Sequence, residues 1–311
     1  MYWILLAVGA QFLNAIVAII DKRIVSDEAI LPRPFVYAFY TCLISGVWIV
    51  VYFLSFLPLP FNGLHIPSFA NVLRPTLEVV ALSFLAAYTF FMALVSMFTA
   101  FQDADASDVV PVVGATSAVA SFGLGYFFLE GAMSQNFLLG IALLALGTFL
   151  VSRFHFTIKT AMLSFHAGLF FAFHYVVIKG LFIVTTFDDA FFWSRIGFVL
   201  YALSLLLVPT YYKKIMEQTK STSPKAGILI FFNKLVAGVA TILILKATDM
   251  GDVAVVQALG GLQFVFILIF GIFFTLSPVK PKGCDNCPPE SILKKAIFVS
   301  IIVLGFLVLF K

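Results

Sequence analysis

The chain has 311 residues, of which 62% are hydrophobic and only 11% charged, and its mean hydropathy is +1.09. A soluble domain of this length cannot bury so much apolar surface, so the composition excludes a soluble globular protein and indicates a membrane protein. The net charge of +4 comes from basic residues spread over the predicted loops, which argues against a nucleic-acid-binding surface.

Apolar runs of about twenty residues predict membrane-spanning helices. We predict ten of them, over residues 2–20, 34–56, 77–99, 107–128, 133–152, 161–184, 190–210, 226–247, 253–275 and 293–310. The longest gaps lie near 57–76, 211–225 and 276–292, which leaves no room for a soluble domain. The first run has no basic segment before it and no small-residue cleavage site after it, so we expect a retained helix rather than a signal peptide.

Lysines and arginines lie mainly in the loops that follow the odd-numbered runs. The loop after 190–210, for example, carries Lys213, Lys214, Lys220 and Lys225. Because short loops rich in Lys and Arg stay in the cytoplasm, this distribution predicts that these loops are cytoplasmic and that both termini lie outside.

A short element occurs twice. Asp105 to Asp108 and, 144 positions later, Asp249 to Asp252 read Asp-x-x-Asp, are followed by Val, and precede a long apolar run. These carboxylates could form a proton or ion site. An aspartate at a helix start, however, also accepts hydrogen bonds from the free N–H groups of the first turn, and we favour this capping interpretation.

The chain also matches itself over a longer distance. Lys22 follows the first apolar run and Lys179 lies near the end of the sixth, so that residues 1–152 and 153–311 match as two five-helix repeats. Because five is odd, the second repeat must enter the membrane from the opposite side. Inverted repeats are typical of secondary transporters, whose substrate site lies between the repeats near the midplane. A duplicated scaffold without transport, such as a membrane enzyme or a receptor, is the alternative.

The end of the first repeat carries a more specific pattern. Glu130 closes the fourth predicted helix, and Gly140 and Gly147 follow in the run GIALLALGTFLVS. The pattern resembles the EamA family of the drug/metabolite transporter superfamily, and the resemblance covers essentially the whole chain. The second repeat departs from it, because no glutamate closes the ninth predicted helix, SPVKPKGCDNCPP replaces the turn, and only Gly305 keeps a glycine place.

The resemblance implies ten helices around a central cavity, with the fifth and tenth helices peripheral. It also implies a small metabolite as substrate, such as an amino acid, a nucleotide-linked sugar, a phosphorylated sugar or a toxic compound. Its implied orientation has both termini in the cytoplasm, opposite to the orientation that the loop charges predict.

Lys234 is the first candidate for a substrate-binding residue. It lies eight residues into the run 226–247, which is about 12 Å along a helix and close to the bilayer midplane. Polar groups at that depth usually face a cavity or a partner. Lys234 could attract a carboxylate or a phosphate, and the alternative is a lysine paired with a carboxylate of this chain.

Four further residues are candidates for the same cavity. His174 could donate to a ligand, carry a proton or simply be a buried packing residue. Asn14 could face the cavity or bond across helices. Gln257 could line the cavity from the ninth predicted helix, and Tyr88 is a weaker candidate on the third.

Other polar residues have plainer interpretations. Near the start of the seventh predicted helix, Trp193 and Arg195 suit an interfacial anchor, and Asp188 and Asp189 could pair with Arg195.

The cysteines do not form a complete metal site. Cys42 is expected in the core. Cys284 and Cys287 form a lone C-x-x-C, which fits a half-site completed by a second subunit, a redox pair or a tight loop with reduced thiols. No P-loop, H-E-x-x-H or G-x-S-x-G occurs, so we expect no ATP drive, no cofactor, no metal and no enzymatic activity.

The expected function is secondary transport of a small metabolite by alternating access in the plasma or inner membrane. The lipid bilayer and the small-molecule substrate are the expected partners, and nucleic acid is not. A coupling ion or counter-substrate and a homodimer stay open. The alternative is a membrane enzyme or a lipid-handling protein that uses the same intramembrane cavity.

Overall fold

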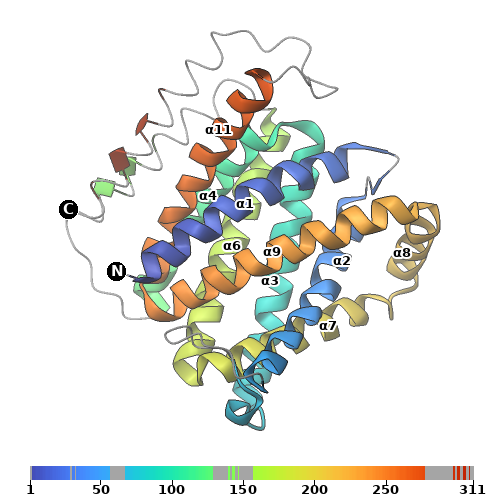
Figure 1. Cartoon of the computed structure of the whole chain (residues 1–311), viewed down its shortest axis with the longest axis vertical. Coiled ribbons are helices and arrows are strands. Elements are labelled where there is room, and N and C mark those ends of the chain that lie inside the picture. The colour runs from blue at the N-terminus through green and yellow to red at the C-terminus, as the bar shows by residue number, and fades with distance from the viewer. Residues whose placement is uncertain are drawn as a thin grey trace.

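The computed structural model describes residues 2–28, 30–31, 33–56, 67–128 and 157–276, and isolated helical positions between 139 and 146 and between 297 and 308. Within these residues the regular structure is helical and no β-strand occurs, which confirms the all-α prediction (Figure 1). The α-helices are α1 (Tyr2–Ser26), α2 (Pro34–Ser45), α3 (Leu77–Asp103), α4 (Ala106–Phe128), α6 (Ile158–Val184), α7 (Phe187–Leu205), α8 (Pro209–Ser221), α9 (Pro224–Met250), α10 (Val253–Ala258) and α11 (Leu262–Leu276). The 3-10 helices are η1 (Gly46–Phe56), η2 (Phe69–Asn71) and η3 (Leu259–Gly261).

Six of the described spans are long and apolar enough to cross a membrane, and there are seven if α7 and α8, which meet at 99°, count as one. The six are α1, α2 continued by η1, α3, α4, α6 and α9. These helices fit a multi-pass membrane protein, as predicted. The predicted helices at 133–152 and 293–310 lie outside the described residues except at isolated positions, and so do Glu130, Gly147, Cys284 and Cys287.

The gap near 211–225, expected to be a loop, instead contains α8. Pro209 stands in its first turn, Ile215 is buried on its inner side, and Lys213, Lys214 and Glu217 are exposed. Such an amphipathic helix contains no continuous apolar run, so a search for membrane spans misses it.

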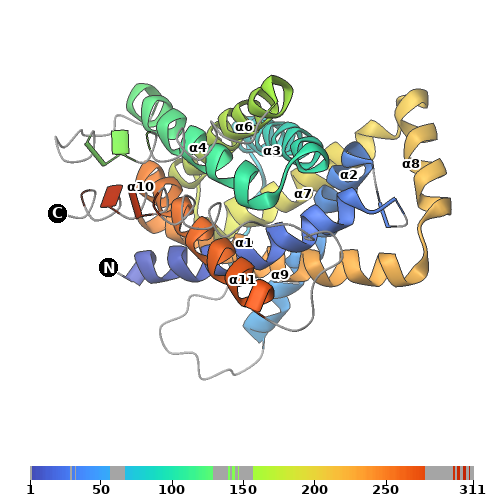
Figure 2. The same ribbon diagram turned by 90° about the horizontal axis from the view of Figure 1, so that it is seen from above.

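The helices lie in two layers (Figure 2). One side holds α3, α4 and α6, and the other holds α1, α9 and α11. Within the layers α6 packs against α3 and α4, and α1 packs against α9 and α11. A glycine allows one close approach: a Cβ atom on Gly168 of α6 would lie 2.6 Å from the backbone oxygen of Val113 in α4.

Helices α3 and α9 resemble each other in length and in how they end. Each has 27 residues, and their first residues, Leu77 and Pro224, are 147 positions apart (224 − 77). At the C-terminal end of α3, Nζ of Lys22 donates hydrogen bonds to the backbone oxygens of Phe101 and Ala104, the latter at 2.9 Å. The ammonium thus satisfies carbonyl groups that the helix leaves unpaired, at the negative end of its dipole.

The end of α9 has the same arrangement. Nζ of Lys179, from α6, donates to the backbone oxygens of Thr248, Asp249 and Gly251 at 2.9, 2.9 and 3.1 Å. We call these two contacts the lysine clamps. Each lysine therefore holds a helix that belongs to its own half of the sequence.

The two aspartates of the second Asp-x-x-Asp element have different roles, because one caps a helix and the other forms an ion pair. Oδ1 of Asp252 accepts a hydrogen bond from the backbone N–H of Val255 at 3.1 Å, which confirms the predicted cap at the start of α10. Asp249 instead pairs with Lys246 at 2.8 Å, near the end of α9. Asp105 and Asp252 each stand directly before a helix and are 147 residues apart (252 − 105), the same offset as the first residues of α3 and α9.

Candidate functional site

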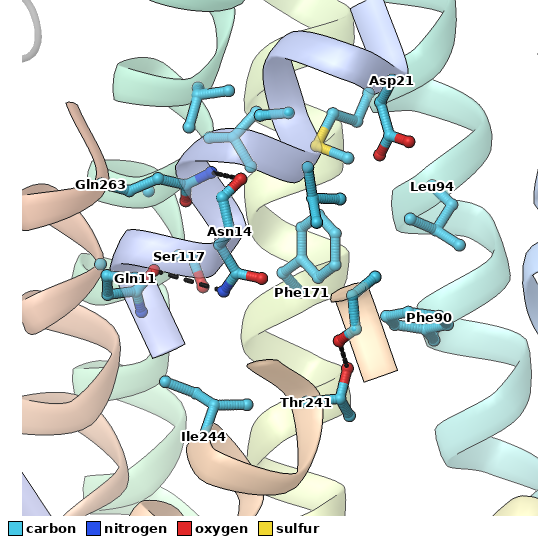
Figure 3. Close-up of a pocket in the computed structure, with 18 of the residues that line it drawn as sticks. Gln11, Asn14, Asp21, Phe90, Leu94, Ser117, Phe171, Thr241, Ile244 and Gln263 are labelled. Atoms are coloured by element: carbon cyan, nitrogen blue, oxygen red, sulfur yellow. Dashed lines mark hydrogen bonds between the residues drawn. The ribbon is translucent and has the colours of Figure 1, made fainter. Parts of the chain in front are cut away.

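A cavity of about 160 Å³ lies between the two layers (Figure 3). It is lined by α1, α9, η3 and α11 from one side, by α3, α4 and α6 from the other, and by single residues of α2 and α10. Apolar walls come from Phe90, Leu94, Val113, Phe171 and Ile244. A cavity of about 150 Å³ holds a benzene-sized molecule, so this one suits a small ligand.

One end of the cavity holds a buried ion pair. Nζ of Lys234 in α9 lies 2.9 Å from Oδ1 of Asp21 in α1, and both side chains are 4% exposed. Nδ2 of Asn233 donates to the same oxygen at 2.6 Å, and the hydroxyl of Tyr37 donates to it as well. The Lys234 ammonium also lies 4.2 Å from the centre of the Tyr37 ring and 5.2 Å from that of Phe98.

These contacts explain how two charges are tolerated at such depth. Removing an ion from water costs several kcal/mol, and a buried pair compensates for it only when its geometry is good and further hydrogen bonds are made. Asp21 accepts from two neutral donors besides Lys234, and aromatic rings face the ammonium, which attract cations. The pair joins α1 to α9 across positions far apart in the sequence.

Neutral polar side chains form a second group, nearer the N-terminus of α1 than Asp21. Nδ2 of Asn14 donates to Oε1 of Gln11 at 3.4 Å, and Oγ of Ser117 donates to Oε1 of Gln257 at 3.2 Å. Nε2 of Gln263 donates to the backbone oxygen of Asn14 at 3.0 Å. Figure 3 shows Gln11, Asn14 and Gln263 close together and away from Asp21.

The two polar groups are separated along α1. Gln11 and Asp21 are ten residues apart, which is about 15 Å along an α-helix. The cavity therefore has a charged end and an amide-rich end, with apolar side chains between them. Such a lining suits a small ligand with both apolar and hydrogen-bonding parts.

Three of the five predicted site residues line this cavity, namely Lys234, Asn14 and Gln257. His174 and Tyr88 are not among its lining residues. His174 is 3% exposed, and its Nδ1 lies 2.9 Å from the backbone oxygen of Ala86, so it packs against α3.

Tyr88 is 41% exposed and lies on the outside of α3. Phe90 and Leu94 of the same helix line the cavity. Because each residue of a helix turns by about 100°, the two-residue step turns by about 200°, so Tyr88 and Phe90 project about 160° apart and Tyr88 cannot face the cavity.

Asp21 lines the cavity but is not among the site residues predicted from the sequence. The first predicted helix ends at residue 20, whereas α1 continues to Ser26 and carries Asp21 inside the bundle. A signal was present: Gln11, Asn14 and Asp21 fall within about 80° of one another around a helix and so share a face. Asn233 was also missed, because it projects about 100° from Lys234, and yet both reach Asp21.

Within the described residues, no three or more His, Cys, Asp or Glu side chains come together as metal ligands. No protein-family model and no curated protein matches this chain. Among solved structures, one described only as "Crystal structure of protein" matches with a TM-score of 0.64 and 14% identity, over 99% of this chain and 96% of its own length. At this identity the match shows a shared fold alone.

Proposed function

We propose that the protein is a secondary transporter of a small metabolite, not driven by ATP, that works by alternating access in the plasma or inner membrane. The observation that carries the proposal is the Asp21–Lys234 pair, which lies buried in a cavity between two layers of apolar helices. Ionisable residues at such depth are rare and usually mark a substrate or ion pathway.

The proposal includes an architecture of ten helices in two inverted five-helix repeats, as in the EamA family. Three features support it. The helices α3 and α9 have equal length, and each is closed by a lysine clamp from its own half. The halves also pack reciprocally, because α1 lies against α9 while α6 lies against α3.

In this scheme the ion pair belongs to one state of the transport cycle. Asp21 comes from the first repeat and Lys234 from the second, so the pair can hold the repeats together only while they keep this arrangement. A substrate with polar groups competes for one partner and weakens the pair. Binding then differs in free energy between the states, which any coupled cycle requires.

The test begins with purified protein and a panel of metabolites in a thermal-shift assay, followed by flux of each binding compound into liposomes. We expect at least one binder to be transported, and the Lys234→Ala variant to lose both the shift and the flux. Lys225→Ala is the matched control, because Lys225 lies on the same helix and is exposed.

Two results would count against the proposal. If no compound that binds is carried across the liposome membrane, the protein is not a transporter of those ligands. If a ligand stabilises Lys234→Ala as strongly as the wild type, the site is elsewhere. If Lys234→Ala lost flux but kept ligand binding, Lys234 would be needed for the transport cycle and not for binding the substrate.

A further inference from the structure

A second buried cation lies outside the ion pair. Arg195 of α7 is 4% exposed, and its guanidinium lies 5.1 Å from the centre of the Phe191 ring and 4.6 Å from that of Phe198. It is therefore not the interfacial anchor that its sequence position suggests. The two rings attract the cation but offer it no hydrogen-bond acceptor.

One edge of this guanidinium is unpaired. Within the described part of the chain, neither Nε nor Nη2 of Arg195 has a hydrogen-bond partner. The ionisable groups that interact with its charge include Cys42, Tyr52, His174 and Tyr175, none of which is a carboxylate. The buried guanidinium therefore has no counter-charge among them.

The acidic residues of the same helix bind elsewhere. Asp188 accepts from Nδ2 of Asn71 at 2.6 Å, and Asp189 accepts from the backbone N–H of Leu73 at 2.8 Å. These contacts hold the segment before α3, and they replace the expected pairing with Arg195. The unpaired edge is thus not explained by the nearest acids in the sequence.

The chemistry of that edge is specific. Nε and Nη2 lie along the same edge of the planar guanidinium, and an N–H group of each points outward in parallel. This is the side-on geometry that takes both oxygens of a carboxylate in a bidentate contact. Buried charges in proteins are normally paired, and no described residue pairs with this edge.

A single layer of aromatic side chains separates Arg195 from the candidate cavity. The Phe198 ring, which faces Arg195, packs against Phe90 at 5.0 Å between ring centres, and Phe90 lines the cavity. Tyr175, another ionisable neighbour of Arg195, lines the cavity as well. Arg195 thus lies directly behind aromatic side chains of the cavity wall.

We propose that Arg195 binds the carboxylate of a small organic anion that enters through the cavity. Asp21 and Lys234 cancel each other's charge, so Arg195 adds one positive charge beside the cavity. Passage of the anion past the aromatic layer rests on the proposed transport cycle. The recognition of a carboxylate does not, because it depends on the guanidinium edge alone.

The test uses two compounds of nearly equal shape, sodium benzoate and benzamide, with the full-length protein in detergent at constant ionic strength. We expect benzoate to raise the melting temperature of the wild type at concentrations at which benzamide does not. In Arg195→Met the benzoate shift is lost. The unliganded variant melts higher than the wild type, because it no longer buries an unpaired charge.

Two further variants sharpen the result. Arg195→Lys keeps the charge but lacks the side-on edge, so benzoate should require about tenfold or more higher concentrations. Arg74→Met is the matched control, because Arg74 is exposed, and it should respond to benzoate like the wild type.

Several outcomes would overturn the proposal. These are an equal response of the wild type to both compounds, a benzoate response that survives in Arg195→Met, and an Arg195→Met protein that melts lower or fails to fold. A higher melting temperature without any benzoate response in the wild type would mean that Arg195 pairs with a carboxylate of this chain in another state. Absence of flux in liposomes would contradict only the transport function, because binding is measured without a membrane.

Discussion

Lys234 and Arg195 are both buried cations of apolar helices, but their surroundings differ. Lys234 has a carboxylate at 2.9 Å, in a network with Asn233 and Tyr37. Arg195 has two aromatic rings and no acceptor on Nε or Nη2 within the described residues. Asp21 neutralises Lys234, whereas no described residue pairs with the Nε and Nη2 edge of Arg195.

The effect of a buried charge on stability depends on whether it has a partner. The consequence of deleting a charged residue depends less on the residue itself than on the group it leaves behind. Deleting a partner of the Asp21–Lys234 pair leaves an uncompensated ion, whereas deleting Arg195 leaves none. The same rule applies to helix ends, where the expected effects are smaller.

The largest effect is expected for Asp21→Leu, which leaves the Lys234 ammonium buried without its counter-charge. Loss of one partner of a buried pair costs about 3–5 kcal/mol of unfolding free energy. The control is Asp103→Leu, which breaks a pair of the same N–O distance, 2.9 Å, between the exposed Lys159 and Asp103. That change should cost at most about 1 kcal/mol. Reversible unfolding in mixed detergent measures both, and equal losses would refute the burial argument.

The double variant Asp21→Leu/Lys234→Met should recover most of that loss, because well-packed apolar residues often replace a buried pair at little cost. We expect a stability within about 1–2 kcal/mol of the wild type, but no ligand response and no flux. If the two single losses simply add, the residues do not act as a pair.

The lysine clamps should show a smaller loss that is similar in the two halves. Lys22→Met and Lys179→Met each leave backbone carbonyls without a charged donor, and we expect about 1–3 kcal/mol for each. Lys220→Met is the control, because Lys220 lies in the last turn of α8 and is exposed. Clearly unequal losses would argue against two equivalent units.

The smallest losses of unfolding free energy are expected for changes to Asp249 and Asp252, the second Asp-x-x-Asp element. Asp252→Ala removes a cap at an exposed helix start, where water can replace it, and should cost about 0.5–2 kcal/mol. Asp249→Ala breaks a partly exposed pair with Lys246 and should cost about 0–1 kcal/mol. The reverse order, measured by the same unfolding assay, would show that the capping assignment is wrong.

Much of the fold follows from local patterns in the sequence. Long apolar runs determine which segments become membrane-spanning helices, because lipid offers no partner for unpaired backbone groups. Residues such as Thr76 and Ser223 determine where helices start, because their hydroxyl oxygens accept from first-turn N–H groups. The position of Lys234 in its apolar run was likewise enough to predict that it lies deep within the helix.

Which polar residues meet depends on how the helices pack against one another. Asp21 and Lys234 are 213 positions apart, and their contact depends on how α1 packs against α9. Packing also turned Tyr88 away from the cavity and buried Arg195 with Nε and Nη2 unpaired among the described residues. Helix periodicity defines the faces of each helix, but in a chain that is apolar on nearly every face it does not say which face meets a neighbour and which meets lipid.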